Sequence, residues 1–260
     1  MVNSIPVVAE QAREMTLKII LSRKGFDSAS GGTPSPIVDG VPKSLPIPSG
    51  KYPSSSTYGE LGLGDIVSRA NRKWTADTRC HEDPMFWEER CALGQTSAAQ
   101  SHLAKNGVGV GDVFLFFGLF AEQGSNDRHH RIFGYLRIEK VQKIGCQPSG
   151  HEAGSTPRKH PHTIGRWDAK NTIYLGPGKK ANKAHQVLRL TKPGGPVSYW
   201  LVPQWLYETG LTYHRRVERW GEDGTLRVVG RGQEFVADVG DMPEPKKWLD
   251  EVITAIGTDE

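Results

Sequence analysis

The chain has 260 residues, 37% of them hydrophobic, together with 30 Gly and 17 Pro; this composition allows a proper core but predicts many loops. The longest apolar run, 113–121, has the length of a strand and falls well short of the ~18 residues that a membrane helix needs, so we expect no membrane partner. The formal net charge of +4 is only mildly basic. A protein that coats DNA carries a large positive excess, so this class is excluded.

The cysteines and the N-terminus bear on the cellular compartment. Cys80, Cys91 and Cys146 are odd in number and widely spaced, without zinc-ligand spacing, which favours a reducing compartment. Residues 1–14 lack the pattern of a signal peptide, and Met15 could be the true start, so we expect 1–14 to be a mobile extension. The expected location is the cytoplasm.

The first element is a short apolar run at 17–21, rich in β-branched residues, which predicts a buried strand. A loop rich in Gly and Ser follows up to 37, with Arg23 and Lys24 at its mouth. Such a loop can aim backbone N–H groups at an anion, although its spacing is not that of a P-loop. The alternative is a simple connection between two strands.

The remaining elements follow from periodicity and from turn signals. We expect helices at 66–73, capped by Asp65, at 98–105 and at 245–256. Residues 113–120 and 132–141 predict a β-hairpin, and Asp223-Gly224 predicts a second one. The other expected strands are 172–175, 186–190 and 197–202, with 216–220 and 225–229 flanking the second turn and 235–239 extending that sheet; 74–95 is expected to be irregular and 146–170 to be a long polar loop.

These elements predict an α+β fold in which a mixed, largely antiparallel sheet, or a partly open barrel, of roughly ten strands carries a few flanking helices. We expect one domain over 15–260. A partly open barrel would be reminiscent of PUA-like barrels, which read bases in nucleic acids, by analogy of fold alone.

Several motifs are distinctive. They are SRKGFDSASGGTPSPI (22–37), HEDP (81–84), GQTSAAQSHL (94–103), HRIFGYLRI (130–138), HPH (160–162), NTIYL (171–175), LTYH (211–214) and RGQEFV (231–236). Over residues 17–238 they resemble a bacterial and phage family, the nucleotide modification associated domain family, type three. The resemblance implies a role in the synthesis, processing or reading of modified nucleotides in DNA, with a nucleotide or DNA as the partner.

The sharpest chemical pattern is His81-x-Asp83 with His160 and His162 much later in the chain. Two imidazoles and one carboxylate are what a non-haem iron site needs, so these four residues are candidate ligands of Fe(II) or another divalent transition metal. On a strand, His81 and Asp83 would point the same way. Arg166 could then pair with an oxo-acid cosubstrate, as in a base hydroxylase. The alternative is coincidence among nine histidines.

Two further carboxylates are candidate catalytic groups. Asp27, near Arg23 and Lys24, could act as a base or orient a sugar, or could only form an Asx-turn. Glu234 has an apolar flank, and could face the site or merely pair with Arg231.

Other residues are candidates for holding a nucleotide. Gln95 could read a base edge through its amide, and an aromatic ring could stack on a base. The expected phosphate- or nucleotide-binding residues are Arg23, Lys24, Ser28, Ser30, Gly31, Gly32 and Gln95, and the candidate stacking residues are Phe26, Tyr52, Tyr58, Trp74 and Trp87.

The sequence thus predicts an enzyme that acts on a nucleotide or DNA base, with Asp27, His81, Asp83, His162 and Glu234 carrying the chemistry. The first loop and the two histidine segments are expected to line one cleft. A nucleophile elbow is absent, and so is the second half of a zinc-deaminase motif. The alternatives are a non-catalytic PUA-like reader of modified bases and an interaction module of a restriction or phage-defence system; the oligomeric state does not follow from the sequence.

Overall fold

The computed structural model describes residues 16–50, 53–148, 156–230 and 232–258. The expected N-terminal extension, Tyr52 and Arg231 lie outside these residues. Within them, no helix combines the length and the apolar character needed to cross a bilayer. The cytoplasmic location and the limits of the single domain stay predictions.

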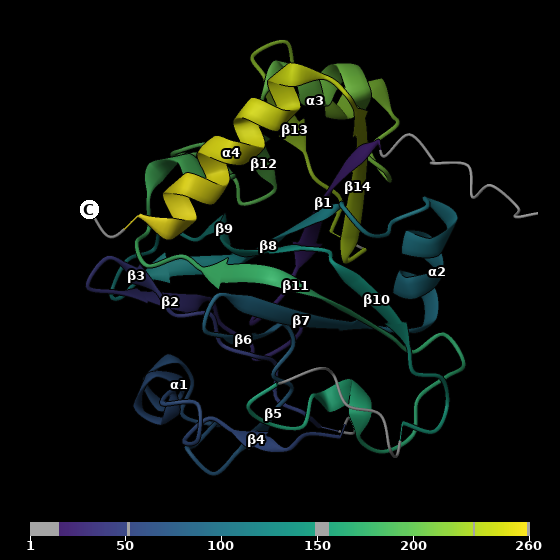
Figure 1. The fold of residues 1–260 in the computed structure, drawn as a ribbon. Coiled ribbons are helices and arrows are strands. Elements are labelled where there is room, and N and C mark those ends of the chain that lie inside the picture. Colours follow the sequence, from purple (N-terminus) through teal and green to yellow (C-terminus); the bar gives the residue numbers. More distant parts are fainter. Residues whose placement is uncertain (1–15, 51–52, 149–155, 231, 259–260) are drawn as a thin grey trace, which may run out of the picture.

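One mixed sheet organises the described part of the chain (Figure 1), with ten strands and the central order β14-β1-β8-β9-β11-β7-β6. Strand β1 pairs in parallel with β8, and β2 does the same, whereas the other pairs are antiparallel. The sheet stays open and does not close into a barrel. The predicted α+β class with a mixed, largely antiparallel sheet is therefore confirmed.

The elements have the following bounds. The strands of the main sheet are β1 (Leu17–Arg23), β2 (Ser35–Val38), β3 (Val41–Pro42), β6 (Met85–Trp87), β7 (Arg90–Gln95), β8 (Val113–Glu122), β9 (His129–Arg137), β10 (Lys140–Lys143), β11 (Thr172–Lys180) and β14 (Glu234–Gly240), and two small pairs are formed by β4 (Ser56–Thr57) with β5 (Arg79–Cys80) and by β12 (Tyr199–Leu201) with β13 (Thr225–Arg227). The helices are α1 (Gly64–Ala70), α2 (Ser97–Lys105), α3 (Gln204–Thr209) and α4 (Pro243–Gly257), with 3-10 turns η1 (Pro161–Thr163), η2 (Gln186–Leu188) and η3 (Val217–Arg219).

Strand β8 lies at the centre because it is apolar on both faces. Successive side chains of a strand point to opposite faces, and those of β8 enter two separate cores. Leu115 and Phe117 pack in the core beneath α4, with Trp200. Phe114 and Phe116 pack in the core on the opposite face. Figure 1 shows α4 across one face of the sheet and α1 with the β4–β5 pair on the other side.

Most of the expected elements are present. The helices expected at 66–73, 98–105 and 245–256 correspond to α1, α2 and α4, and the first hairpin corresponds to β8 and β9. Each of these helices buries apolar side chains on one face, which is Val67 alone in α1 and Leu103 alone in α2, but several residues in α4.

Four local predictions are wrong. Residues 186–190 form a 3-10 turn and no strand, and the irregular region 74–95 contains the buried strand β7. The second hairpin does not form, because β13 pairs with β12 and residue 220 contributes only an isolated bridge. In the same way, 235–239 belongs to β14 and pairs with β1 in the main sheet. Long-range pairing overrides the local signals at these sites.

The partly buried His130 makes the stability of the fold depend on pH. Its Nδ1 accepts a hydrogen bond from Trp200 Nε1 (3.0 Å), and burial, aided by the charges of Arg23 and His129, lowers the pKa of His130 to about 3. An unfolded histidine has a pKa near 6.5, so between about pH 6.5 and pH 3 the unfolded state binds the additional proton.

We therefore expect the unfolding free energy to fall as the pH is lowered through this window, with roughly 1 kcal/mol per pH unit due to His130. His130→Asn keeps an acceptor for Trp200 but cannot titrate, so its dependence on pH should be shallower by about that slope. Urea unfolding at several pH values measures the difference. Parallel curves for the two proteins would contradict the assignment.

Candidate metal centre

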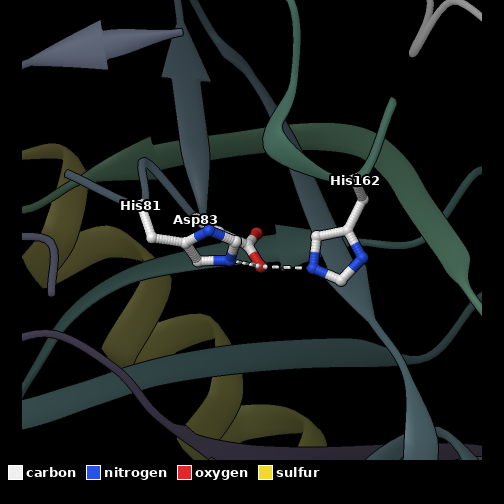
Figure 2. Close-up of side chains that lie close together, drawn as sticks. All are labelled: His81, Asp83 and His162. Atoms are coloured by element: carbon white, nitrogen blue, oxygen red, sulfur yellow. Dashed lines mark ion pairs between the residues drawn. The ribbon is translucent and has the colours of Figure 1, made fainter. Parts of the chain in front are cut away.

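Three of the four candidate ligands come together. His81 Nε2 lies 3.8 Å from Asp83 Oδ2, and His162 Nε2 lies 3.6 Å from the same oxygen. One ligand atom from each residue lies within 4.8 Å of those of the other two. Figure 2 shows both imidazoles directed at the carboxylate between them. The group contains two imidazoles and one carboxylate, a donor set that suits a divalent transition metal.

A tight turn, and no strand, places His81 and Asp83 on the same side. Strand β5 ends at Cys80, after which Glu82 N donates to Cys80 O (3.1 Å) and Asp83 N donates to His81 O (2.8 Å). Each bond joins a residue to the second one before it, which is the pattern of a γ-turn. The shared direction that a strand would give is therefore present, but it comes from this turn.

Glu82, between the candidate ligands His81 and Asp83, points the other way and joins the two histidine segments. Its carboxylate accepts a hydrogen bond from Ser56 Oγ (2.8 Å) and two from Arg158, at 3.1 Å from Nε and 2.6 Å from Nη2. Glu82 is 6% exposed, and a two-pronged Arg–carboxylate pair has a defined geometry. Arg158 starts the segment that leads to His162, so this ion pair brings the second histidine to the first.

The tautomer of His162 is fixed by Asn171 at the start of β11. His162 Nδ1 lies 2.6 Å from Asn171 Oδ1, and Asn171 Nδ2 donates to His162 O (2.9 Å). Because the amide oxygen only accepts, Nδ1 must carry the proton, which leaves the lone pair of Nε2 toward Asp83. Trp167 stacks on the ring at 4.0 Å, and Gly94 lies beneath it, where a Cβ would overlap the imidazole.

Asp83 is oriented by contacts to its other oxygen. Oδ1 accepts a hydrogen bond from Gly94 N (2.9 Å) and lies 3.4 Å from His160 Nε2. His160 Nδ1 in turn accepts from His162 N (3.2 Å), so the neutral ring carries its proton on Nε2, facing Asp83. His160, predicted as a fourth ligand, is thus placed to orient the carboxylate, while Oδ2 faces the two other imidazoles.

The protonation states suit metal ligation. Burial alone would raise the pKa of Asp83, but the close approach of His160 and the electrostatic effects of the three histidines hold it below its ordinary value. Burial lowers the pKa of His81 and, despite the charge of Asp83, lowers the pKa of His162 to about 3. At neutral pH the group therefore consists of two neutral imidazoles and a carboxylate, the forms that bind metals.

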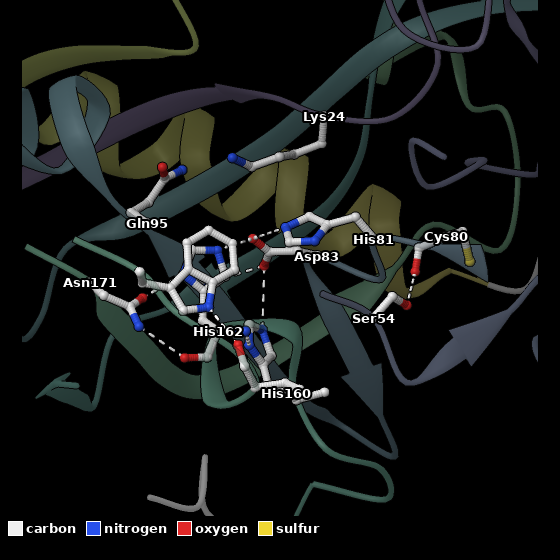
Figure 3. A network of polar contacts seen from close by, with 12 residues as sticks. Lys24, Ser54, Cys80, His81, Asp83, Gln95, His160, His162 and Asn171 are labelled. Atoms are coloured by element: carbon white, nitrogen blue, oxygen red, sulfur yellow. Dashed lines mark hydrogen bonds and ion pairs between the residues drawn. The ribbon is translucent and has the colours of Figure 1, made fainter. Parts of the chain in front are cut away.

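The first loop and the histidine segments line one cavity of about 390 Å³. A cavity of this size falls within the range of small-molecule sites. Its wall includes Arg23, Lys24, Asp27, Ser30, His81, Asp83, Gly94, Gln95, Thr96, His162, Trp167 and Gly232. Figure 3 shows Lys24 and Gln95 beside the triad, with His160 on the other side of Asp83.

Other predicted site residues do not line this cavity. Ser28 and Gly32 are exposed, and Glu234 lies behind the wall, 1% exposed. Gly31 has a φ of +88°, and a Cβ there would overlap the ring of Phe26. Its carbonyl accepts from Asn71 Nδ2 and Trp74 Nε1, so Gly31 shapes the loop.

Asp27 forms the Asx-turn that was the alternative to a catalytic role. Its Oδ1 accepts hydrogen bonds from the backbone N–H groups of Ala29 (2.8 Å) and Ser30 (2.6 Å), which is an Asx-turn. Arg23 likewise serves the scaffold, because its guanidinium donates to the carbonyls of Val229 and Gly230. Lys24 differs: its Nζ lies on the cavity wall, 2.9 Å from Glu234 Oε1.

The four candidate aromatic residues within the described part of the chain do not line this cavity. Phe26 and Tyr58 are buried in a small core beneath the first loop; Trp74 packs against that core, and Trp87 packs against another. Arg166 is exposed and does not line the cavity. Trp167 does line the cavity, and no motif in the sequence marked it.

Two comparisons place the chain among known proteins. The model of the family described as nucleotide modification associated domain 3 matches residues 18–238. The chain belongs to this family. A probable dipeptidyl-aminopeptidase B from Metarhizium robertsii is 35% identical over 64 residues, which are 25% of this chain and 7% of that protein. No solved structure matches the chain.

Membership confirms the resemblance of the motifs and associates the chain with nucleotide modification. The peptidase match covers too little of either chain to bear on activity.

The packing of Gly94 against His162 predicts a sharp steric response. In Gly94→Ala the new Cβ must displace the imidazole, and overpacking of this kind costs about 1–3 kcal/mol of stability. Gly109→Ala is the matched control, because a Cβ at Gly109 would have no neighbour within 4 Å, and its effect should stay within about 0.5 kcal/mol. Urea unfolding measures both, and equal stability of the two variants would contradict the described contact.

Proposed function

We propose that the protein is a metal-dependent enzyme that modifies a nucleotide or a DNA base. His81, Asp83 and His162 would hold Fe(II) or another divalent transition metal. The observation that carries the proposal is the convergence, on one side of a cavity, of two neutral imidazoles and one oriented carboxylate. When bound, such a metal supplies a centre with open coordination positions for a substrate.

The surroundings of the three residues fit this role better than a purely structural one. Asn171 and His160 hold His162 and Asp83 in the orientations that leave Nε2 and Oδ2 facing each other. Groups of this kind commonly orient the ligands of metal sites. His81 and His162 both face the carboxylate in neutral form, an arrangement in which a cation would compensate the buried charge of Asp83.

The cavity beside the triad fits a nucleotide. It combines an aromatic ring, Trp167, with an amide, Gln95, and an ammonium group, Lys24. Aromatic rings stack on bases, amides hydrogen-bond their edges, and an ammonium group suits a phosphate or carboxylate. Membership of a family associated with nucleotide modification supports this substrate class.

Metal binding tests the proposal directly. The purified protein should bind one equivalent of Fe(II) or Mn(II) in anaerobic titration calorimetry, and Asp83→Asn should weaken this binding strongly. Asparagine keeps an acceptor for Gly94 N but removes the charge. The loss of metal affinity should exceed the roughly 10–100-fold loss that results from changing a group that only orients a ligand. His185→Ala, a change at an exposed histidine, should bind like the wild type.

The reaction is tested by mass spectrometry of nucleosides from the DNA of cells that carry the wild type or Asp83→Asn. A nucleoside present with the wild type alone supports an enzyme. Identical nucleosides, together with metal-independent binding of modified DNA, would support the non-catalytic reader. Wild-type metal affinity in Asp83→Asn would refute the metal site itself.

The role of Asn171 gives a separate prediction. Asn171→Leu removes the acceptor from His162 Nδ1, which frees the tautomer, and should reduce metal affinity by about 10–100-fold. Asn171→Asp retains the acceptor and should lose much less of the metal affinity. Calorimetry with the same metal compares the two variants, and an equal loss in both would show that the hydrogen bond does not orient His162.

A further inference from the structure

A second buried polar cluster lies behind the cavity wall. Glu234 Oε1 is 2.5 Å from Gln95 Nε2, 2.9 Å from Lys24 Nζ and 3.1 Å from Ser22 Oγ. Gln95 ends β7, Glu234 begins β14, and Ser22 belongs to β1. Three strands thus bring their ends to one carboxylate, and two of its partners, Gln95 and Lys24, line the cavity beside the candidate metal ligands.

Glu234 fixes the orientation of the Gln95 amide. An ionised carboxylate only accepts hydrogen bonds, so the NH2 group of Gln95 must face Glu234 and its carbonyl oxygen must face elsewhere. Among the described residues, no group donates to that oxygen, although Gln95 is only 5% exposed. The amide therefore retains a fixed, unused acceptor on a side chain of the cavity wall, next to the donor Lys24.

The burial and partial pairing of Glu234 indicate that this residue has a role other than stabilising the fold. It is 1% exposed, and its second oxygen, Oε2, is buried with no hydrogen-bond partner in the described structure. A buried carboxylate that is only partly paired is costly. An unsatisfied buried polar group of this kind calls for an explanation, such as a functional role or a bound water or ion.

We propose that Gln95 recognises the hydrogen-bonding edge of a nucleobase, and that Glu234 is the positioning residue that sets which edge it accepts. This inference rests on the proposed function, since it assigns the base of the substrate to the cavity beside the triad. Gln95 offers an acceptor and Lys24 a donor, next to each other. Nucleobase edges carry N–H donors beside acceptor atoms, and paired hydrogen bonds to them discriminate between bases.

The test compares the binding of the common nucleoside 5′-monophosphates to the metal-loaded protein by calorimetry. The wild type should favour one base over the others by about 10-fold or more, as expected for a paired contact. Glu234→Gln replaces an acceptor-only group by an amide that also donates, so Gln95 becomes free to turn over. The preference between bases should then shrink several-fold, while the affinity for the metal stays that of the wild type.

Gln95→Leu is the second variant, in case Glu234→Gln fails to fold; it should also lose the preference between bases. Gln204→Leu, the same change at an exposed glutamine of α3, should retain it. A wild-type preference that persists in Glu234→Gln or Gln95→Leu would overturn the proposal, as would a wild type that binds all the bases equally. Metal binding, measured on the same samples, reports on the proposed function separately.

Discussion

The buried carboxylate of Asp83 is the interaction on which the site depends. A charge removed from water is costly unless it is paired or hydrogen-bonded, and the two oxygens of Asp83 have different neighbours. One oxygen is held by Gly94 N and His160, and the other faces His81 and His162. Because Asp83 is fixed in this way, the imidazoles converge on one oxygen, and the cavity acquires a site with the chemistry of a metal centre.

Two ion pairs connect this site to the fold. Glu82 with Arg158 joins the two histidine segments on the side away from the cavity, and Glu234 with Lys24 joins β14 to the first loop on the cavity side. Gln95 and Glu234 belong to strands separated by four others in the sheet, yet their side chains touch. The sheet must therefore curve strongly although it stays open, and the cavity lies where its two ends approach.

The sequence was informative about the fold where a local pattern coincided with burial. The helix expected at 245–256 and the hairpin begun by 113–120 are present because their apolar faces are long and regular. Local sequence patterns failed where a strand pairs with a segment that is distant in the sequence. The Asp223-Gly224 signal predicted a local hairpin, but residues 225–227 pair with a strand more than twenty residues earlier. No local feature distinguishes these two partners.

For the site, the sequence by itself determined the residue types. The His-x-Asp pair and the later histidines made His81, Asp83, His160 and His162 the candidate ligands, with coincidence among nine histidines as the alternative. Only the tertiary structure decided that His81 and His162 face one oxygen of Asp83 and that His160 lies against the other. It also decided the roles of Asn171, Trp167 and Gly94, since each depends on a distance between segments far apart in the chain. The spacing of residues in the sequence indicates which chemical groups are available, whereas the contacts between these groups depend on the tertiary structure.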